Sequence, residues 1–152
     1  VLLKGIEDQG FVFYTNYDSQ KGQELSANPL AALCFNWLDL QRQVRIEGRV
    51  ERHSAAASEA YFKSRPKGSQ IGAWASPQSQ VVANRQVLED NYARLEATHA
   101  ADDVLPKPEH WGGFIVRPTV IEFWQGRSSR LHDRLRYTEQ PDGTWQLDRL
   151  AP

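Results

Sequence analysis

The 152-residue sequence lacks methionine and contains one cysteine, Cys34. A single thiol excludes an internal disulfide and fits a reducing compartment, so we expect a cytoplasmic protein in which Cys34 lies in the core rather than acting as a nucleophile. No window approaches the roughly 18 consecutive apolar residues of a membrane helix, and residues 1–4 do not resemble a signal peptide. The missing methionine and the strand-like start lead us to expect a piece of a longer protein whose N-terminal segment is absent.

Charge of one sign is not in excess either, because 18 basic residues stand against 19 acidic ones and the net charge is −1. This balance argues against nucleic acid as a partner, so an anionic ligand must be held by local basic clusters. The sequence contains no GxGxxG, no GxxxxGK[ST] and no GxSxG motif, which removes support for a dinucleotide fold, a P-loop and a Ser-His-Asp hydrolase. The four histidines lack HxxxH or HExxH spacing, so we expect no metal site.

The residues that are present predict one domain over residues 1–152, with 40% hydrophobic and 24% charged residues. Helices are expected after the capping residues Ser19 or Asp18 and Ser54, ending near residues 28 and 64. The helical spacing of apolar residues predicts a third, amphipathic helix over residues 84–99. Residues 31–37 read as a buried strand and residues 43–52 as a half-solvated one. The remaining strands are expected at residues 1–6, 11–15, 111–116, 120–124, 135–138 and 145–150, with turns at 7–10 and 141–143. Hairpin-linked strands with inserted helices predict a mainly β protein, an antiparallel barrel rather than βαβ units.

The first candidate site is a group of donors at the end of the second expected helix. Tyr61 and Arg65 are four residues apart and share a helix face, and Lys67 and Ser69 follow just past the helix. Such donors suit a phosphomonoester, which carries about −1.5 to −2 charges. Spacing alone favours the simpler interpretation, a solvated helix end with a turn.

The second candidate is Ser19-Gln20-Lys21-Gly22 at a helix start, where backbone N–H groups favour an anion and Lys21 adds charge. An ordinary capped helix explains the same residues.

The third candidate is the segment Glu122-Phe123-Trp124-Gln125-Gly126, followed by residues 130–134. In a strand, Arg130, His132 and Arg134 would share one face, which requires a carboxylate or an anionic ligand to neutralise them. A charged outer strand face explains this pattern equally well.

These clusters resemble the pyridoxine (pyridoxamine) 5′-phosphate oxidase family. The matching strings span essentially the whole chain in the family's order, and together they are very specific. They are Val1-Leu2-Leu3-Lys4, Phe13-Tyr14-Thr15-Asn16, Arg42-Gln43-Val44, Tyr61-Phe62, Ser64-Arg65-Pro66, Ser69-Gln70-Ile71-Gly72-Ala73, Gln78-Ser79, Trp111-Gly112-Gly113, Glu122-Phe123-Trp124-Gln125-Gly126, Arg130-Leu131-His132-Asp133-Arg134 and Asp148-Arg149-Leu150-Ala151-Pro152.

The resemblance implies an FMN-binding split β-barrel that works as a homodimer with FMN at the subunit interface. It implies an enzyme of vitamin B6 metabolism, a pyridoxal 5′-phosphate synthase that oxidises pyridoxine 5′-phosphate or pyridoxamine 5′-phosphate with O₂ and releases hydrogen peroxide. A hydride would pass from the substrate's 4′ carbon to the flavin, while the protein orients the two rings.

The resemblance also implies roles for individual residues. The substrate phosphate would be bound by Lys4, Tyr61, Arg65 and Ser69. Arg130, Leu131 and His132 would border the pyridine ring, and Arg130 and His132 would act in catalysis by orienting and polarising it. The FMN contacts would be Val1, Leu2, Leu3, Lys4, Tyr14, Thr15, Gln20, Lys21, Gln43, Gln78, Ser79, Trp124 and Arg134.

The chain departs from the family's pattern in two places. Gln20 stands where the family usually has an arginine, which removes a charge-assisted contact to the FMN phosphate worth about 1.5–3 kcal/mol. The family's N-terminal segment, with an arginine just before Val1, is also absent from the sequence.

Three other functions compete with the oxidase hypothesis. A flavin reductase or another split-barrel flavoprotein would need neither the Tyr61, Arg65 and Ser69 cluster nor residues 130–134. A binding module that stores FMN or pyridoxal 5′-phosphate would not bleach the flavin when substrate is added without oxygen. A structural β-domain would carry the same charges without so many ordered family strings.

Overall fold

A computed structural model describes residues 1–7 and 10–152. The turn expected at residues 7–10 includes residues 8 and 9, which lie outside that description. The chain forms two compact units, which are described one at a time. The first unit comprises Val1–Gly5, Val12–Asn28 and Arg52–Ile115, and the second comprises Ile6–Phe11, Pro29–Glu51 and Val116–Pro152. The expectation of a single domain stays a prediction.

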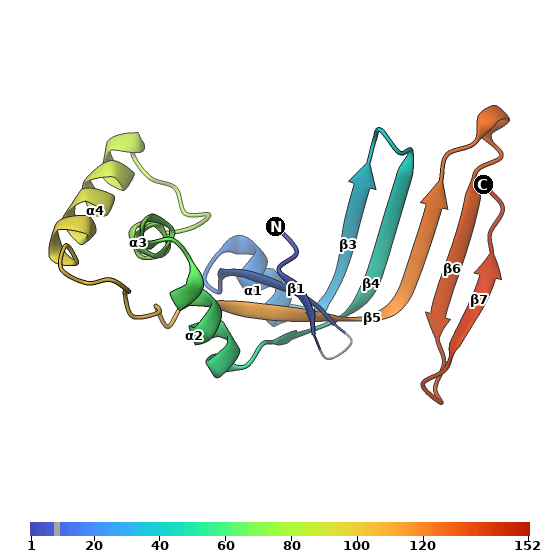
Figure 1. The fold of residues 1–152 in the computed structure, drawn as a ribbon, viewed down its shortest axis with the longest axis horizontal. Coiled ribbons are helices and arrows are strands. Elements are labelled where there is room, and N and C mark those ends of the chain that lie inside the picture. The colour runs from blue at the N-terminus through green and yellow to red at the C-terminus, as the bar shows by residue number, and fades with distance from the viewer. Residues whose placement is uncertain (8–9) are drawn as a thin grey trace. The chain divides into compact units, whose positions relative to one another are not determined.

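The α-helices of the described residues belong to the first unit (Figure 1). Three expected helices are confirmed, because Ser19, Ser54 and Asn84 each accept a backbone N–H at the N-terminus of α1, α2 and α4. A fourth helix, α3, was not expected from the sequence, and it places Ser69 inside a helix rather than just past one. The helices are α1 (Gln20–Ala27), α2 (Ala55–Ser64), α3 (Lys67–Ala75) and α4 (Arg85–Thr98).

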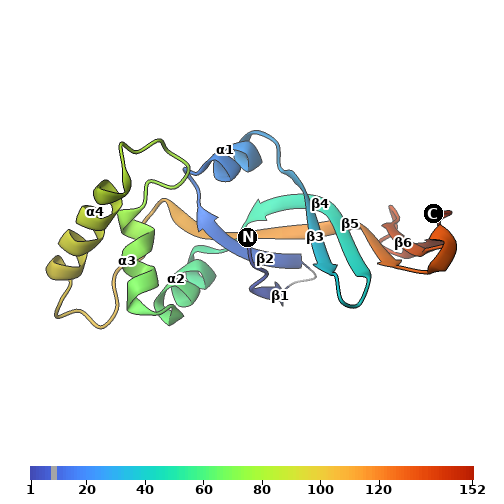
Figure 2. The same ribbon diagram turned by 90° about the horizontal axis from the view of Figure 1, so that it is seen from above.

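The core of the first unit lies where α3 and α4 approach the start of strand β5 (Trp111–Gln125). Phe62, Ile71, Leu105 and Trp111 are buried together, and Tyr92 and Leu95 of α4 pack against them. In both ribbon views α3 lies between α2 and α4 (Figures 1 and 2). Among the described residues, no helix is long and apolar enough to cross a membrane.

The strands pair in the order β1-β2-β5-β4-β3, and β6 pairs with β5 and with β7. β3 pairs with β4, β5 with β6 and β6 with β7 in antiparallel fashion, which confirms the mainly β class with inserted helices. The other strands are β1 (Gly5–Glu7), β2 (Gly10–Asn16), β3 (Leu30–Trp37), β4 (Arg42–Arg52), β6 (Asp133–Glu139) and β7 (Trp145–Arg149).

Several strand expectations hold in detail. β4 alternates as predicted, with Ile46 and Val50 buried between exposed charged residues. The turn before β7 contains Gly143 at φ +79°, a left-handed conformation that glycine adopts readily, and Leu135 pairs with Arg149 across the hairpin. The pairing of β1 with β2 is also confirmed.

Four expectations were wrong. β1 covers only Gly5–Glu7, so residues 1–4 are not in a strand, although Lys4 donates its N–H to the Val12 carbonyl. The strands at 111–116 and 120–124 are one strand, β5, which continues through Pro118. Exposed and half-buried residues alternate along β3, so one face of the strand is uncovered, and Cys34 lies on that face and is exposed rather than in the core.

The fourth correction concerns residues 130–134. Arg130 lies in a short 3₁₀ helix, Ser128–Arg130, with Ser129 and Arg130 in left-handed conformations at φ +57° and +61°. His132 follows it in a loop, and only Asp133 and Arg134 belong to β6. The alternation of a strand therefore does not apply to Arg130 and His132.

Candidate functional site

A pocket of about 500 Å³ opens in the first unit between the start of the chain, β2, α1, α2 and the first turn of α3. Its lining contains three basic residues and no acidic one, so its chemistry favours an anionic ligand. Ten of the predicted site residues line it, together with Pro66 and Trp111, which were not assigned to the site. The predicted ones are Val1, Leu2, Lys4, Tyr14, Thr15, Lys21, Tyr61, Arg65, Ser69 and Gln78.

Arg65 is held by aromatic rings rather than by a carboxylate. Its guanidinium carbon lies 4.7 Å from the centroid of the Trp111 ring and 5.6 Å from that of Phe62. Atom Nη1 is buried and has no hydrogen-bond partner among the described residues. Burial lowers the pKa of Arg65, an effect opposed by Tyr61. A buried cationic donor without a partner is costly, and an anionic ligand would supply that partner.

The backbone at Arg65 is fixed by Gln70, a buried residue of α3. The Gln70 amide nitrogen donates to the Arg65 carbonyl at 2.8 Å and to the Lys63 carbonyl at 3.3 Å, and its oxygen accepts the Leu105 N–H at 2.8 Å. These bonds satisfy a side chain that would otherwise be expensive to bury. The C-terminal end of α2 and the start of α3 therefore form a defined corner that carries Arg65.

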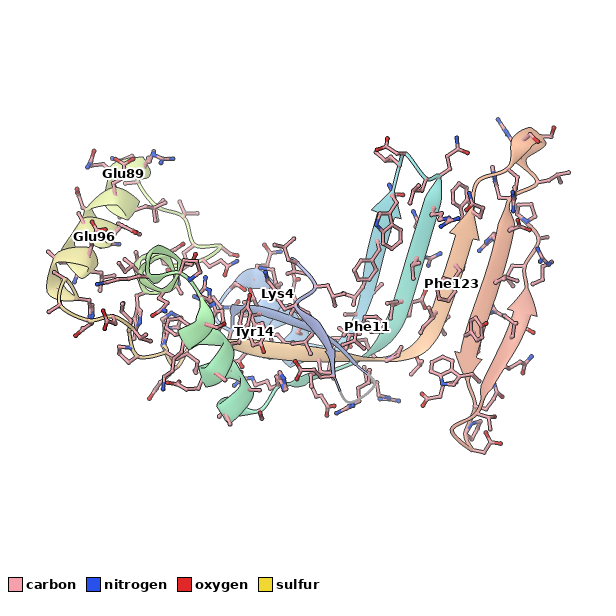
Figure 3. All side chains as sticks on the ribbon, in the orientation of Figure 1. Lys4, Phe11, Tyr14, Glu89, Glu96 and Phe123 are labelled. Atoms are coloured by element: carbon pink, nitrogen blue, oxygen red, sulfur yellow. The ribbon has the colours of Figure 1, made fainter. Side chains whose placement is uncertain are left out.

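Aromatic rings form one wall of the pocket. The ring centroids of Tyr14 and Tyr61 are 4.0 Å apart with planes 14° from parallel, and Tyr14 stacks on Trp111 at 5.4 Å. Lys4 reaches the same wall, with its Nζ 5.9 Å from the Tyr61 ring centroid, and Figure 3 shows Lys4 beside Tyr14. Trp111 therefore belongs both to the buried core and to the aromatic wall of the pocket. Its position after a loop in the sequence did not indicate this second place.

The other side of the pocket is polar. Lys21 Nζ donates to Thr15 Oγ1 at 3.3 Å, and Gln78 Oε1 accepts the Asn16 N–H at 3.3 Å and the Thr15 hydroxyl at 3.5 Å. Ser19 caps α1 by accepting the Gly22 N–H, and its own hydroxyl donates to the Asn16 carbonyl at 2.6 Å. The start of α1, Lys21 and Gln78 are therefore linked through one turn of the chain.

Three predicted residues of the first unit do not line this pocket: Leu3, Gln20 and Ser79. The Gln20 side chain is exposed and donates to Glu24 Oε1 at 2.8 Å. Ser79 has a left-handed backbone at φ +71° in the turn after Pro77. Their contacts with a cofactor stay predictions.

The remaining predicted residues, Gln43, Trp124, Arg130, Leu131, His132 and Arg134, lie in the second unit. The Trp124 and His132 rings are 4.8 Å apart between centroids. His132 Nδ1 accepts the Arg127 N–H at 3.1 Å, so a neutral ring carries its proton on Nε2. Arg130 and Leu131 are exposed. No group of three His, Cys, Asp or Glu side chains that could hold a metal occurs in the described part of the chain.

Arg134 is paired with a buried carboxylate that the sequence reasoning did not assign. Its Nε and Nη2 donate to the two oxygens of Glu122 at 2.8 and 3.1 Å, and its Nη1 donates to the Ala151 carbonyl at 3.2 Å. The hydrogen bond from Arg134 is the largest cause that lowers the pKa of Glu122, and the charges of Arg134, Arg45 and Arg136 lower it further. Glu122 is therefore the carboxylate that neutralises Arg134.

Replacement of Glu122 by glutamine should lower the free energy of unfolding at neutral pH by about 2 kcal/mol, because the paired charge of Arg134 loses its carboxylate. A lowered folded-state pKa stabilises the fold above the unfolded pKa, and this contribution is lost as the pH falls through the folded value. The difference between parent and variant should therefore shrink at acidic pH, which urea titrations at several pH values would measure. Exposed Glu96 (Figure 3) provides the control Glu96→Gln, and a pH-independent Glu122→Gln difference would contradict the assignment.

Comparisons with known proteins identify the family of this chain. Residues 1–99 match the model of the pyridoxamine 5′-phosphate oxidase family, and residues 111–152 match the pyridoxine 5′-phosphate oxidase C-terminal dimerisation region. The chain is 60% identical to the pyridoxine/pyridoxamine 5′-phosphate oxidases of Salinibacter ruber and of Synechocystis sp., over its whole length and 71% and 70% of theirs.

Two solved structures have a similar fold. PhzG from Burkholderia lata 383, in complex with tetrahydrophenazine-1-carboxylic acid, superposes with a TM-score of 0.91 at 29% identity, covering 99% of this chain and 72% of PhzG. A pyridoxamine 5′-phosphate oxidase-related FMN-binding protein from Nostoc punctiforme shares the fold, with a TM-score of 0.76 at 14% identity, covering 99% of this chain and 78% of that one. This chain therefore belongs to the pyridoxamine 5′-phosphate oxidase family.

Proposed function

We propose that the chain is an FMN-dependent oxidoreductase that converts pyridoxine 5′-phosphate or pyridoxamine 5′-phosphate and O₂ to pyridoxal 5′-phosphate and hydrogen peroxide. One observation carries the proposal. The residues expected to bind the substrate phosphate and several of those expected to bind FMN line a single basic pocket of the first unit. Family membership and the curated relatives support the same activity.

The substrate phosphate is bound by Arg65, Lys4, Tyr61 and Ser69. Arg65 contributes most, because its buried Nη1 has no partner among the described residues and its guanidinium is already oriented on Trp111. A planar guanidinium can donate two parallel hydrogen bonds to phosphate oxygens. Arg65 therefore needs little rearrangement to bind a phosphomonoester.

FMN is held on the polar side of the same pocket, with Lys21 and Gln78 toward its phosphate and with Thr15 between them. When bound, FMN supplies the acceptor for the substrate hydride. The predicted contacts from Leu3, Gln20, Gln43, Ser79, Trp124 and Arg134 complete the cofactor site in a homodimer, with FMN at the subunit interface. Arg130, Leu131 and His132 border the pyridine ring, and because His132 Nδ1 accepts the Arg127 N–H, Nε2 is the ring nitrogen that can donate to the substrate.

The decisive experiment mixes the purified protein with FMN and pyridoxine 5′-phosphate in air and follows pyridoxal 5′-phosphate and hydrogen peroxide together. Equal amounts of both products are expected. If FMN binds tightly and neither product forms, the flavin colour is followed under substrate without oxygen. Bleaching would identify a slow enzyme, whereas unchanged colour would contradict an oxidase and indicate a storage module.

Restoring an arginine at position 20 should tighten FMN binding by about tenfold, the lower end of what a charge-assisted hydrogen bond provides. Gln20 is the first residue of α1 and its side chain is exposed, so the longer side chain can be accommodated. Fluorescence titration of FMN gives the dissociation constant. Gln23→Arg adds the same charge to an exposed position of the same helix and serves as the control. Equal tightening by both variants would indicate a general charge effect rather than a contact at position 20.

A further inference from the structure

The Arg65 guanidinium lies against the Trp111 ring. Its guanidinium carbon is 4.7 Å from the centroid of that ring, closer than it is to the Phe62 ring. An aromatic face attracts a cation through the charge distribution of the ring and not through a hydrogen-bond acceptor, so the N–H groups of the guanidinium stay available to a ligand. In agreement with this, the buried Nη1 of Arg65 has no hydrogen-bond partner among the described residues.

The position of Trp111 is fixed through both its ring and its backbone. The buried ring meets the Phe62 ring edge-on at 5.2 Å and stacks on the Tyr14 ring at 5.4 Å with planes 8° from parallel. Lys107 Nζ donates to the Trp111 carbonyl at 2.9 Å, and the Trp111 N–H donates to the Pro108 carbonyl at 3.2 Å. A side chain packed in this way keeps one rotamer, so the ring is a rigid surface for the guanidinium.

Arg65 is held separately at its backbone. The Gln70 amide nitrogen donates to the Arg65 carbonyl at 2.8 Å, and the Gln70 oxygen accepts the Leu105 N–H at 2.8 Å. Leu105 belongs to the connection between α4 and β5, and β5 begins with Trp111. The segment that leads to Trp111 is therefore tied to the segment that carries Arg65, and the arginine is held at its backbone by Gln70 and at its guanidinium by Trp111.

We propose that Trp111 is a positioning residue for the substrate phosphate, because its ring holds the Arg65 guanidinium where the buried Nη1 can donate to a phosphate oxygen. This role rests on the proposed function, since it takes the substrate phosphate as the ligand of Arg65. A long arginine side chain loses rotamer freedom when it binds a ligand, and holding it in advance reduces that loss. Trp111 acts through Arg65 and needs no contact of its own with the phosphate.

The role of Trp111 can be tested with a ligand that cannot be oxidised. The probe is 4′-deoxypyridoxine 5′-phosphate, which has a methyl group in place of the substrate's 4′ alcohol, and isothermal titration calorimetry on the FMN-loaded protein gives its dissociation constant. Trp111→Leu keeps the core apolar but removes the aromatic face, so the dissociation constant should rise by about tenfold. Trp111→Phe keeps an aromatic face and should stay within about threefold of the parent.

Two controls separate positioning from support of the fold. Trp74→Leu makes the same exchange in the same unit at a half-exposed tryptophan that does not line the pocket, and it should leave probe binding unchanged. In an Arg65→Ala background, Trp111→Leu should weaken probe binding no further, because a residue that acts only through Arg65 has no effect once Arg65 is gone. FMN affinity, from fluorescence titration, should change little in the Trp111 variants.

Several results would overturn the proposal. These are unchanged probe binding in Trp111→Leu, equal weakening by the leucine and phenylalanine variants, additive losses in the Arg65→Ala background, and a loss of FMN affinity as large as that of the probe. If far-UV circular dichroism shows that Trp111→Leu does not fold, Trp111→Met replaces it, because methionine fills irregular core space without an aromatic ring.

The two proposals fail in different ways. A parent protein that does not bind the probe would overturn both the phosphate site and the role of Trp111. A parent that binds the probe, with the expected pattern among the variants, but forms no pyridoxal 5′-phosphate in the oxidase assay would contradict the proposed activity and still support the role of Trp111.

Discussion

Replacement of Arg65 by alanine should raise the KM for pyridoxine 5′-phosphate by about 100-fold while the dissociation constant of FMN changes little. A charge-assisted contact to a ligand contributes about 1.5–3 kcal/mol, and a partly buried phosphate left without its cation adds to the loss. Arg65 is suited to this role because Nη1 is buried without a partner among the described residues, so the alanine variant gives up no intramolecular ion pair. Steady-state kinetics and FMN titration on the same preparation measure the two constants.

Lys63→Ala provides the control for Arg65. Lys63 lies two residues away on α2, pairs with Glu59 at 3.1 Å and does not line the pocket, so its loss should leave both constants unchanged. The KM of an Arg65→Lys variant should fall between those of the parent and the alanine variant, because lysine keeps the charge but lacks the planar guanidinium that donates two parallel hydrogen bonds. Equal losses of substrate and FMN affinity in Arg65→Ala would show that the residue supports the pocket rather than the substrate phosphate.

The parts of the fold that the sequence predicted correctly depend on local chemistry. Ser19, Ser54 and Asn84 accept backbone N–H groups within three residues, so a helix start can be recognised without knowledge of distant contacts. The turn at Gly143 could also be recognised locally, because its left-handed backbone is one that glycine adopts readily.

Helix α3 was missed because its stability is not local. Residues 67–75 include Gly68 and Gly72, which lower helix propensity, and they follow Pro66, which read as a stop signal. The helix is stabilised by tertiary contacts instead, since Ile71 and Gln70 are buried and Gln70 bonds to residues on both sides. Packing of this kind overrides propensity and is not visible in a short window of sequence.

The errors on the strands have a related cause. An apolar run such as residues 31–37 predicts burial only if the strand is covered on both faces, and the sequence does not say which faces are covered. Exposed and half-buried residues alternate along β3, and Cys34 lies on the uncovered face. The expected common face of Arg130, His132 and Arg134 failed because the chain turns at Ser129 and Arg130 with positive φ angles, which side chains other than glycine seldom adopt.

The family's strings select residues that the fold brings together at one pocket, whereas spacing alone did not, and the binding roles of these residues stay predictions. Spacing alone favoured a solvated helix end for Tyr61 and Arg65, yet both line the basic pocket. Trp111 was missed because a tryptophan at the start of a strand reads as core. Its second function becomes visible only when the Arg65 guanidinium is placed 4.7 Å from its ring. Glu122 was missed as a partner because its contact to Arg134 is diagonal across two strands, Trp124 being the residue directly opposite Arg134.

Substitution of Gly22 by alanine should destabilise the protein by about 3 kcal/mol, at the upper end of the cost of inserting a methyl group into a packed site. Gly22 is buried in the first turn of α1, and a Cβ there would collide with the backbone of Tyr17. Because backbone atoms cannot rotate away as a side-chain end can, α1 must shift. Lys21 precedes Gly22 and bonds to Thr15 in the pocket, so FMN binding should weaken as well.

Gly72→Ala is the matched control for Gly22→Ala, since both glycines are helical and both substitutions add one methyl group. A Cβ at Gly72 meets no atom within 4 Å, so alanine should stabilise α3 by up to about 1 kcal/mol through helix propensity. Urea unfolding of the two variants should therefore give shifts of opposite sign. A Gly22→Ala protein as stable as the parent would show that α1 can move away from Tyr17. The FMN affinity of this variant would then decide between two possibilities. A weaker affinity would place Lys21 in the cofactor site, whereas an unchanged affinity would show that α1 is not part of the cofactor site.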